Sequence, residues 1–450
     1  MNFDIYNSVF SYRYGSCEMR KVFGERHKYE IWRKIWVALA KAQNKDGLVS
    51  KKELDDLIKH QNKINIERIY EIEKETKHDV VAAIREFAEV AKIGGGKIHL
   101  GATSMDINDN GDVLKMKEAL DLIENKLKNL MKLFAKQIVK YADTPCIGYT
   151  HLQTAEPTTI GYRLANYAQD LFDDYKYCQF IKDNIKGKGM KGAVGTGASY
   201  TKGIDEAVMT QLGLKSALIS NQIISRQMEY WVMTWLSSIA NTLARFSADL
   251  RILQSTNFGE WSEPFAEKQV GSSAMPFKRN PINSEKICSL SRYITKLVPV
   301  AIENQALSYL ERTLDDSANR RIIIPEVFLA LDEIMITETK IIEGLVINKE
   351  RVERNLIQYA PFAATEKVIL ESVKRGANRQ EMHELIREIS MRVWSEIQLG
   401  EKNNMQELLY QNKVINKLFE KEEFEKLFDV TKHVGEAPER ARRCAKMLLI

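Results

Sequence analysis

The chain has 450 residues, 44% apolar and 28% charged, a composition typical of a globular protein with a large core and two or three domains. Its net charge of +5 is small beside 66 basic and 61 acidic residues, which are interspersed, so nothing favours a nucleic-acid partner. No apolar run approaches the ~18–20 residues of a membrane-spanning helix, so we expect no membrane contact.

The cysteines are odd in number and widely spaced: Cys17, Cys146, Cys178, Cys288 and Cys444. This pattern favours reduced thiols in a cytoplasmic protein over a disulfide framework. The first residues include Asp4 and lack the apolar core of a signal peptide. The histidines form no HxxH or HExxH pair, so we expect no metal site.

Proline placement predicts an all-α fold. No proline precedes Pro145, and none lies between Pro157 and Pro264. These long tracts are rich in Leu, Ile, Ala, Lys and Glu, with almost no strand-like alternation, which indicates long helices.

Residues 25–46 predict an amphipathic helix that Gly47 ends, and a second helix follows from Ser50. Farther on, His78 and Asp79 stand at the entry to an apolar helix. Asp79 is the simplest candidate for the N-cap of that helix. No packing role explains a histidine at position 78.

Residues 92–112 interrupt the helical pattern with three consecutive glycines and a final Asn-Gly-Asp, so we expect a loop and the first domain boundary here. The loop contains His99, Thr103 and Ser104, and a capping role for one of the hydroxyls is the simplest reading. A long amphipathic helix is expected over 113–141.

A second polar loop is expected over 145–163, where Pro157, with Thr158 and Thr159, is expected to start another long helix. This loop carries His151, although a lone loop histidine is more often incidental than catalytic. Residues 186–200 contain a GxGxxG pattern, but it follows a helical pattern instead of a strand, which excludes a Rossmann site. The glycines still predict close backbone approach.

Residues 226–257 are apolar on more than one helical face, which predicts burial inside a bundle or an oligomer. After them, Ser317 and Arg321 are four residues apart on one helix face, and Arg312 joins them only from a non-helical lead-in. Paired arginines beside a hydroxyl suit a phosphate, whereas salt bridges with Asp315 or Asp316 are the alternative.

The segment from Gly259 to Lys286 has little periodicity, and Pro264, Pro276 and Pro281 forbid a regular helix through it. A solvated connector is one interpretation. Its density of polar side chains favours a functional loop instead. We expect residues 262–281 to be a mobile lid, with Gly271 at a φ value that alanine resists.

Within this segment, GSSAMPFKRNP (271–281) resembles the signature loop of the fumarase/aspartase lyase superfamily. The KRNP ending is similar to the adenylosuccinate lyase family, and four more segments share that resemblance: TKHDVVA (76–82), HLGATS (99–104), GYTHLQTAEPTT (148–159) and ERTLDDSANRR (311–321). The last is especially similar to the animal-type enzymes.

The resemblance implies an all-α homotetramer with a long-helix central core and active sites that combine several chains. It also implies three domains, 1–103, 104–347 and 348–450. The partners would be small-molecule substrates, with no cofactor.

The implied reaction is an anti β-elimination that cleaves adenylosuccinate to AMP and fumarate, and the succinyl-aminoimidazole carboxamide ribotide to its carboxamide and fumarate. Such chemistry needs a base for the Cβ proton, an acid for the leaving nitrogen and a group that stabilises the carbanion. By resemblance, the base is Ser272 and the acid is His151. Lys278 and Asn280 would bind the aci-carboxylate, with Lys278 and backbone N–H groups activating the serine, and His78 and Glu285 would support His151.

Substrate contacts are implied in the same way. The nucleotide phosphate and ribose contacts match Arg13, Tyr14, Arg312, Ser317 and Arg321, and the carboxylate contacts match Thr103, Ser104, Thr150 and Gln222. Lys77 and Asp79, on either side of His78, match further substrate-binding positions. Two residues depart from the pattern: Phe277 stands where histidine or tyrosine is common, and Lys286 replaces an arginine, which weakens a bidentate contact.

Two other functions remain open from the sequence. One is another fumarate-releasing lyase, similar to argininosuccinate lyase, which would not need the Arg312, Ser317 and Arg321 cluster. The other is a non-catalytic structural protein similar to the crystallins of this superfamily, against which the intact Ser272 and His151 speak.

Overall fold

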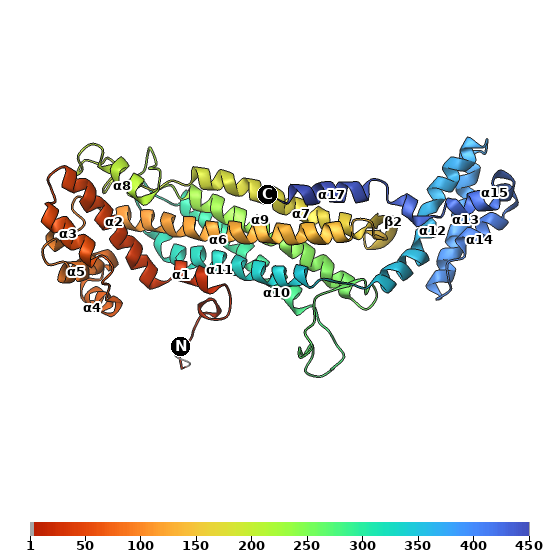
Figure 1. Cartoon of the computed structure of the whole chain (residues 1–450), viewed down its shortest axis with the longest axis horizontal. Helices are drawn as coiled ribbons and strands as arrows, with labels where there is room; N and C mark the ends of the chain where they lie inside the picture. Colours follow the sequence, from red (N-terminus) through yellow and green to blue (C-terminus); the bar gives the residue numbers. More distant parts are fainter. Residues whose placement is uncertain (1–3, 450) are drawn as a thin grey trace. The chain divides into compact units, whose positions relative to one another are not determined.

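The computed structural model describes residues 4–449, and the chain divides into two compact units. The first unit comprises residues 1–127, 174–241 and 289–336, and the second comprises 128–173, 242–288 and 337–450. The division passes through five long helices (Figure 1): α6 (Ser104–Lys140), α7 (Ile160–Asn184), α9 (Gln227–Gln254), α10 (Ile282–Ala306) and α11 (Asp315–Glu343). Helices dominate both units, which confirms the all-α prediction. Residues 1–3 and 450, the ends of the predicted terminal domains, lie outside the described residues.

The rest of the first unit consists of short and medium helices: η1 (Val9–Ser11), α1 (Cys17–Val22), α2 (Glu25–Lys45), α3 (Lys51–His60), α4 (Ile66–Thr76), α5 (Asp79–Val90), η2 (Gly95–Lys97) and α8 (Ile204–Leu212). The helices predicted from residues 25 and 50 are present. Gly47 follows α2 with φ +75°, and Ser50 begins α3 with a capping box in which the Ser50 and Glu53 side chains each accept the other's backbone N–H.

Two helix starts differ from the predictions. The N-cap of α5 is His78 and not Asp79, because His78 has extended backbone angles and its Nδ1 accepts the Val81 N–H at 3.5 Å. Helix α6 begins at Ser104, nine residues before the expected start at Val113. The Thr103 N–H donates to the Asp106 carboxylate at 3.0 Å, and this cap starts the helix inside a polar sequence that had indicated a loop.

The polar residues at the start of α6 are compatible with a helix because their partners are internal. Asp106 is fully buried and accepts hydrogen bonds from the Gly192 N–H at 3.1 Å, from the Tyr200 hydroxyl at 3.1 Å and from Lys188. The glycine-rich segment therefore wraps around a buried carboxylate. It follows helix α7 instead of a strand, as expected, and a Cβ on Gly195 would lie 1.8 Å from the Ser220 carbonyl oxygen.

The second unit contains two small antiparallel sheets, which differ from the expectation of almost no strands. Strands β1 (Pro145–Thr150) and β2 (Gln153–Thr159) form a hairpin within the stretch expected to be a loop, and β3 (Trp261–Ser262) pairs with β4 (Val346–Ile347). Helix α7 then begins at Ile160, so Pro157 lies in β2 and does not start the helix.

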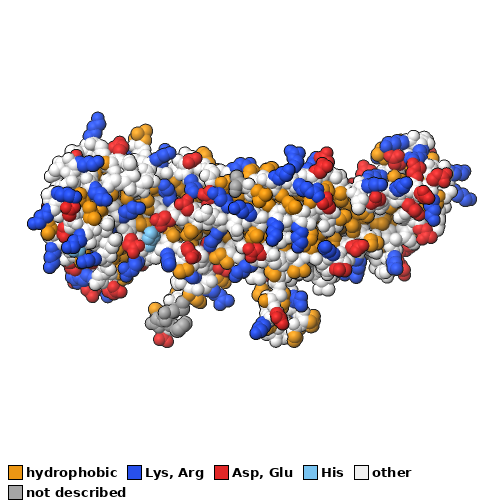
Figure 2. Space-filling model, in the orientation of Figure 1, with side chains coloured by type: hydrophobic (Ala, Val, Ile, Leu, Met, Phe, Trp, Pro, Cys, Tyr) orange, Lys and Arg blue, Asp and Glu red, His pale blue; other side chains and the backbone are white. Residues whose placement is uncertain are grey.

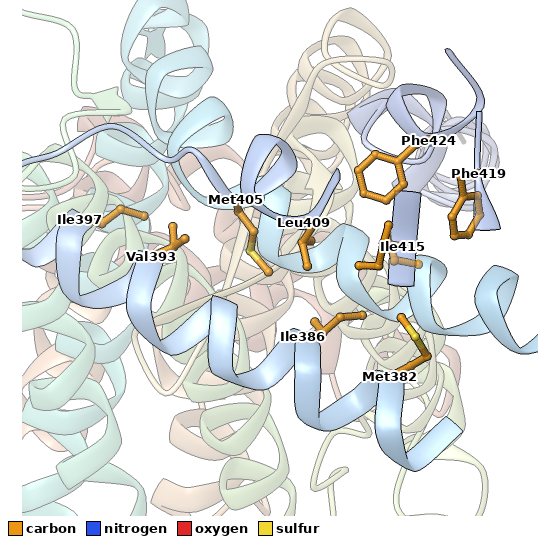
Figure 3. Packing of buried hydrophobic residues seen from close by; sticks show 10 residues of the cluster. Met382, Ile386, Val393, Ile397, Met405, Leu409, Ile415, Phe419 and Phe424 are labelled. Carbon is orange, nitrogen blue, oxygen red and sulfur yellow. The ribbon is translucent and has the colours of Figure 1, made fainter. Parts of the chain in front are cut away.

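The C-terminal part of the second unit has a core of its own. Its helices are α12 (Lys349–Lys374), α13 (Arg379–Gln398), α14 (Met405–Gln411), α15 (Lys413–Leu418), α16 (Lys421–Lys426), η3 (Val430–His433) and α17 (Ala437–Met447). Figure 3 shows side chains from α13 to α16 meeting in one cluster, where Val393, Met405, Leu409 and Phe424 are fully buried.

Helix α9 confirms the long apolar helix expected over 226–257, but its apolar residues are already buried within the chain. Trp235, Leu236, Ile239, Ala240 and Leu243 are 0% exposed. The apolar character of this helix is therefore explained by the monomer, and it does not by itself require a second copy. Among the described residues, no helix is both long and apolar enough to cross a membrane.

Candidate active site

His151 lies at the tip of the β1–β2 hairpin, in the two-residue turn that joins Thr150 to Gln153. His151 has φ +53° and Leu152 has φ +60°, the left-handed angles that a tight hairpin turn requires. Asparagine and glycine normally occupy such turns, and a bulky residue there costs roughly 1–2 kcal/mol. The strained turn holds the imidazole and Thr150 at the exposed end of the hairpin.

A buried ionic cluster around Glu260 holds the hairpin in place. The Tyr149 hydroxyl donates to Glu260 Oε1 at 2.8 Å, and Asn355 Nδ2 donates to the same oxygen at 2.9 Å. Glu260 is fully buried, and Arg163 lies 3.6 Å from its other oxygen while donating to the Ile147 carbonyl at 2.5 Å. Burial, and then the charge of Glu260 and its hydrogen bond, raise the pKa of Tyr149 well above its usual value, so its hydroxyl remains a donor.

The signature segment leaves the fold shortly after Glu260 and forms a long loop between α9 and α10, confirming the absence of a helix here (Figure 1). Most of the loop is exposed, and Figure 2 shows it as a projection with both charged and apolar side chains. Val270 is 75% exposed and Phe277 is 83% exposed.

Ser272 is half-buried at the start of a tight turn in this loop. Its Oγ accepts the backbone N–H groups of Ala274 at 3.3 Å and Met275 at 3.1 Å. Two N–H donors aimed at one hydroxyl oxygen favour negative charge on that oxygen. Lys278 is exposed, and among the described residues its ammonium group has no hydrogen bond to Ser272.

The reason why Gly271 is a glycine differs from the sequence prediction. Gly271 does not have a positive φ, unlike Gly259 at +64°. The constraint is close approach instead, because a Cβ on Gly271 would lie 2.1 Å from the Lys278 carbonyl oxygen. The two sides of the loop therefore touch here, and Asn280 Nδ2 adds a hydrogen bond of 3.0 Å to the Gly271 carbonyl.

The other candidates of the second unit lie at the start of α10. Glu285 is exposed in the first turn of the helix, and no hydrogen bond joins it to His151 within the described residues. Lys286 beside it is half-buried. The role of Glu285 in orienting His151 stays a prediction.

In the first unit, the structure brings together His78 and Ser104, which the sequence separates by 26 positions. Ser104 Oγ lies 3.3 Å from His78 Nε2. The neighbouring Asp79 accepts a hydrogen bond of 3.1 Å from Arg321. Asp79, Ser317 and Arg321 line one pocket, so three of the predicted substrate contacts share a cavity.

Arg312 lies in the non-helical lead-in to α11, as predicted, and its Nη1 is 3.3 Å from Asp316. The salt-bridge alternative is thus the arrangement seen. Asp316 is buried and also accepts a hydrogen bond of 2.7 Å from the buried Arg226, which in turn donates to Asp109 at 2.9 Å. A phosphate would have to share or replace the Asp316 contact of Arg312.

The remaining candidates of the first unit are placed individually. The Gln222 N–H donates to the Glu311 carbonyl at 3.2 Å, which holds Gln222 beside Arg312. Arg13 is exposed, and Tyr14 packs edge-on against Phe10 at 6.0 Å. Thr103 precedes α6, with its backbone N–H bound to Asp106, and Lys77 ends α4 at φ +54°.

His99, on the same loop as Thr103, has a structural role. Its Nδ1 accepts the Trp36 indole N–H at 3.0 Å. Burial lowers the pKa of His99 to about 4, so the ring is neutral and remains an acceptor near pH 7.

Four polar residues of the second unit went unnoticed in the sequence: Gln254, Glu260, Glu263 and Glu338. All are buried or half-buried around the hairpin and the loop. The only available signal was the pair of glutamates in GEWSEPF, just before the prolines of the loop. In the described residues, no group of three or more His, Cys, Asp or Glu side chains is arranged to hold a metal ion.

Comparison with known proteins decides the family. A lyase family model matches residues 13–295, and a model described as the adenylosuccinate lyase C-terminus matches residues 361–444. Adenylosuccinate lyase of Methanocaldococcus jannaschii is 40% identical, covering 95% of this chain and 93% of its own. The chain belongs to the adenylosuccinate lyase family. The Saccharomyces cerevisiae family member is 35% identical over 98% of this chain and 94% of its own.

Solved structures agree on the fold. The 3-carboxy-cis,cis-muconate lactonizing enzyme from Pseudomonas putida superposes with a TM-score of 0.89 at 24% identity, covering 98% of this chain and 99% of its own. A fumarate lyase from Mesorhizobium sp. BNC1 has a TM-score of 0.87 at 21% identity, over 98% and 99%. The predicted fumarase/aspartase-like fold is therefore confirmed.

Proposed function

We propose that the protein cleaves adenylosuccinate to AMP and fumarate, and the succinyl-aminoimidazole carboxamide ribotide to its carboxamide and fumarate. The observation that carries this proposal is the near-complete match to adenylosuccinate lyases at 35–40% identity. The exposed Ser272 loop and the His151 hairpin support it, because they supply the residue types that β-elimination needs.

In the proposed mechanism, Ser272 acts as an alkoxide and removes a proton from the Cβ of the succinyl group. The Cα–N bond then breaks, its electron pair stays on the nitrogen, and His151 supplies a proton to the leaving amine. A double bond forms between Cα and Cβ and gives fumarate. Lys278 and Asn280 stabilise the negative charge that develops on the adjacent carboxylate.

The Ser272 alkoxide is the costly species in this sequence, since a free hydroxyl is far too weakly acidic near pH 7. The Ala274 and Met275 N–H groups already face the oxygen and lower that cost. Closure of the loop would add Lys278 and exclude water, which strengthens both interactions.

We further propose that the first-unit residues hold the nucleotide. Ser317 and Arg321 line a pocket with Asp79, and they suit a phosphate. Ser104 and Thr103 would bind a succinyl carboxylate beside His78, with Gln222 of the first unit and Thr150 of the second unit as further contacts. Arg13, Tyr14, Lys77 and Arg312 complete the predicted set, and Lys286 replaces an arginine in it.

The direct test is an absorbance assay of the purified protein with adenylosuccinate, with fumarate quantified separately. We expect turnover without added metal or cofactor. Activity that chelation abolishes and a divalent ion restores would contradict the cofactor-free part. Release of fumarate from argininosuccinate but not from adenylosuccinate would favour the other lyase reaction, and no release from either would favour a structural role.

The assembly is a separate proposal: a homotetramer whose active sites combine residues of different chains. Mixing inactive His151→Ala and Ser272→Ala proteins tests it, because hybrid tetramers would contain some sites with both residues intact. Partial recovery of activity is expected. No recovery after verified subunit exchange would contradict shared sites.

We also propose a cytoplasmic location, on the basis of the thiols. All five cysteines are free, and four of them are buried. Fractionation of cells that express the protein tests this, and recovery from an oxidising compartment would contradict it.

A further inference from the structure

The base of the signature loop is bridged by one side chain. Gln254 is the last residue of α9, and its Oε1 accepts the Glu263 N–H at 2.9 Å while its Nε2 donates to the Arg279 carbonyl at 2.9 Å. Glu263 lies where the loop leaves the fold, and Arg279 lies where it returns. A single amide therefore binds both ends of the loop that carries Ser272 and Lys278.

Glu263 is itself tied to the helix that follows the loop. Its side chain is 5% exposed, and its carboxylate accepts the Asn283 N–H at 3.2 Å, Asn283 Nδ2 at 3.0 Å and the Ser284 N–H at 2.5 Å. These bonds cap the N-terminus of α10, where a negative charge also interacts favourably with the helix dipole. Glu263 therefore links Gln254 to the start of α10.

A second buried carboxyl lies near Glu263. Glu338 of α11 is 0% exposed, and Ser247 Oγ donates to it at 3.3 Å. Burial, together with the negative charge of Glu263, raises the pKa of Glu338 well above its usual value and favours the protonated form. The Glu263 carboxylate faces the N-terminus of α10, and Glu338 lies behind it in the buried interior.

Beyond this base, the loop is held only by its own atoms among the described interactions. Side-chain bonds run from the Ala274 and Met275 N–H groups to Ser272, from the Ala266 N–H to the Gln269 side chain and from Asn280 to Gly271. Backbone bonds run from the Gln269 N–H to the Ala266 carbonyl and from the Lys278 N–H to the Met275 carbonyl. One further link crosses the base, where the Arg279 guanidinium lies 5.2 Å over the Phe265 ring. The loop is thus exposed in its middle and fixed at its ends.

We propose that Gln254 and Glu263 form a clasp that makes the loop move as one body, so that Ser272 and Lys278 return to the same place at each closure. Both are positioning residues for the β-elimination, and this inference rests on the proposed function. Without the clasp, the two ends of the loop would separate. The serine would then reach the Cβ proton in a wider range of orientations, and a misplacement of about 1 Å costs ~100-fold in rate.

The test replaces Gln254 with methionine, which keeps the length of the side chain but loses both hydrogen bonds. We expect kcat for adenylosuccinate to fall ~10- to 100-fold with KM within about twofold of wild type. Gln254→Glu keeps the acceptor for the Glu263 N–H and loses the donor to Arg279, so its kcat should lie between those of Gln254→Met and wild type. Gln411→Met is the matched control, since Gln411 is exposed and its side chain donates to Glu407 of the same helix α14.

Hydrogen exchange across residues 264–281 gives a readout that does not depend on activity, and it should become faster in Gln254→Met. Faster exchange together with the selective loss of kcat supports the clasp. Unchanged exchange, unchanged kcat, or an equal change in kcat and KM each overturns it. If Gln254→Met does not fold, Gln254→Glu carries the same test. A wild-type protein that leaves adenylosuccinate intact would refute the proposed function, and the clasp would then lose its catalytic role even if exchange changed.

Discussion

His151 and Ser272 both lie on loops of the second unit, and these loops are held in different ways. The His151 hairpin has a β-ladder, fully buried Cys146 and Ile147 in β1, and the Tyr149–Glu260 hydrogen bond of 2.8 Å beneath its tip. The Ser272 loop has an exposed middle and is attached mainly at its base by Gln254 and Glu263. The proposed acid is fixed in place, and the proposed base lies on a largely exposed loop that is held at its base.

This difference fits what each group must do. A histidine acid needs a fixed orientation toward the leaving nitrogen. A serine base must be approached by substrate and then sealed from water, which a fixed wall does not allow. The strain at His151 and Leu152 and the proposed closure of the Ser272 loop are therefore two parts of one arrangement.

The largest expected effect comes from removing the base. Ser272→Ala should lower kcat by ~10³-fold or more with KM little changed, because the hydroxyl acts mainly in the transition state. Steady-state kinetics with adenylosuccinate measure both constants. Ser273→Ala, the exposed neighbour, is the control and should be near wild type. A raised KM with an unchanged kcat would make Ser272 a binding residue and remove the distinction between the two loops.

The comparison also shows what the sequence could and could not reveal. Proline spacing was enough for the all-α class, and Pro264, Pro276 and Pro281 marked the loop. The hairpin was missed because its turn contains His151 and Leu152, which no turn rule favours at positive φ. The ladder and the Tyr149–Glu260 bond offset that strain, and the bond joins residues 111 positions apart.

The early start of α6 was missed for a related reason. Asp106, Asp109 and Asn110 are polar, and polar runs beside Gly111 usually indicate loops. Here they are buried because Lys188, Arg226 and the glycine-rich segment supply their partners. Gln254, Glu263 and Glu338 were invisible in the same way, since a buried polar network forms only after distant helices pack.

The next largest effect should come from distorting the loop itself. Gly271→Ala places a Cβ 2.1 Å from the Lys278 carbonyl oxygen, so the two sides of the loop must separate. We expect kcat to fall ~10- to 100-fold and nucleotide affinity to change less, because Ser317 and Arg321 lie outside the loop. Gly96→Ala is the control, since its Cβ would meet no atom within 4 Å and its φ is not positive. Equal losses in kcat and affinity would show that the loop also holds the nucleotide.

Glu338 should make the stability of the protein fall as pH rises. Its folded pKa is raised, so its contribution is fully present below the unfolded pKa of about 4.3 and is lost as pH rises through the folded pKa. Glu338→Gln removes this dependence. The free energy of unfolding of the variant relative to wild type should therefore rise by up to about 1.4 kcal/mol per pH unit in that window.

Denaturant unfolding of both proteins at pH 5 and pH 9 measures the effect. Glu343→Gln, an exposed glutamate at the end of the same helix, is the control and should show no such trend. If the free energies of unfolding of Glu338→Gln and wild type differed by the same amount at pH 5 and pH 9, the Glu338 carboxyl would already be ionised in the folded protein.

The smallest expected effect concerns the strained turn of the hairpin. Leu152 has φ +60° and is 61% exposed, so its side chain gains little from burial and its backbone carries the left-handed strain. Asparagine tolerates this conformation, and Leu152→Asn should raise the free energy of unfolding by about 0.5–1 kcal/mol. Leu399→Asn is the control, because Leu399 is 84% exposed at φ −86° and has no such strain to lose.

Kinetics of Leu152→Asn add the functional half of the test. If the ladder and Tyr149 fix the hairpin, kcat should stay within about twofold of wild type, since the tip keeps its shape. A more stable variant with a large loss of kcat would instead show that strain at the tip itself aims His151.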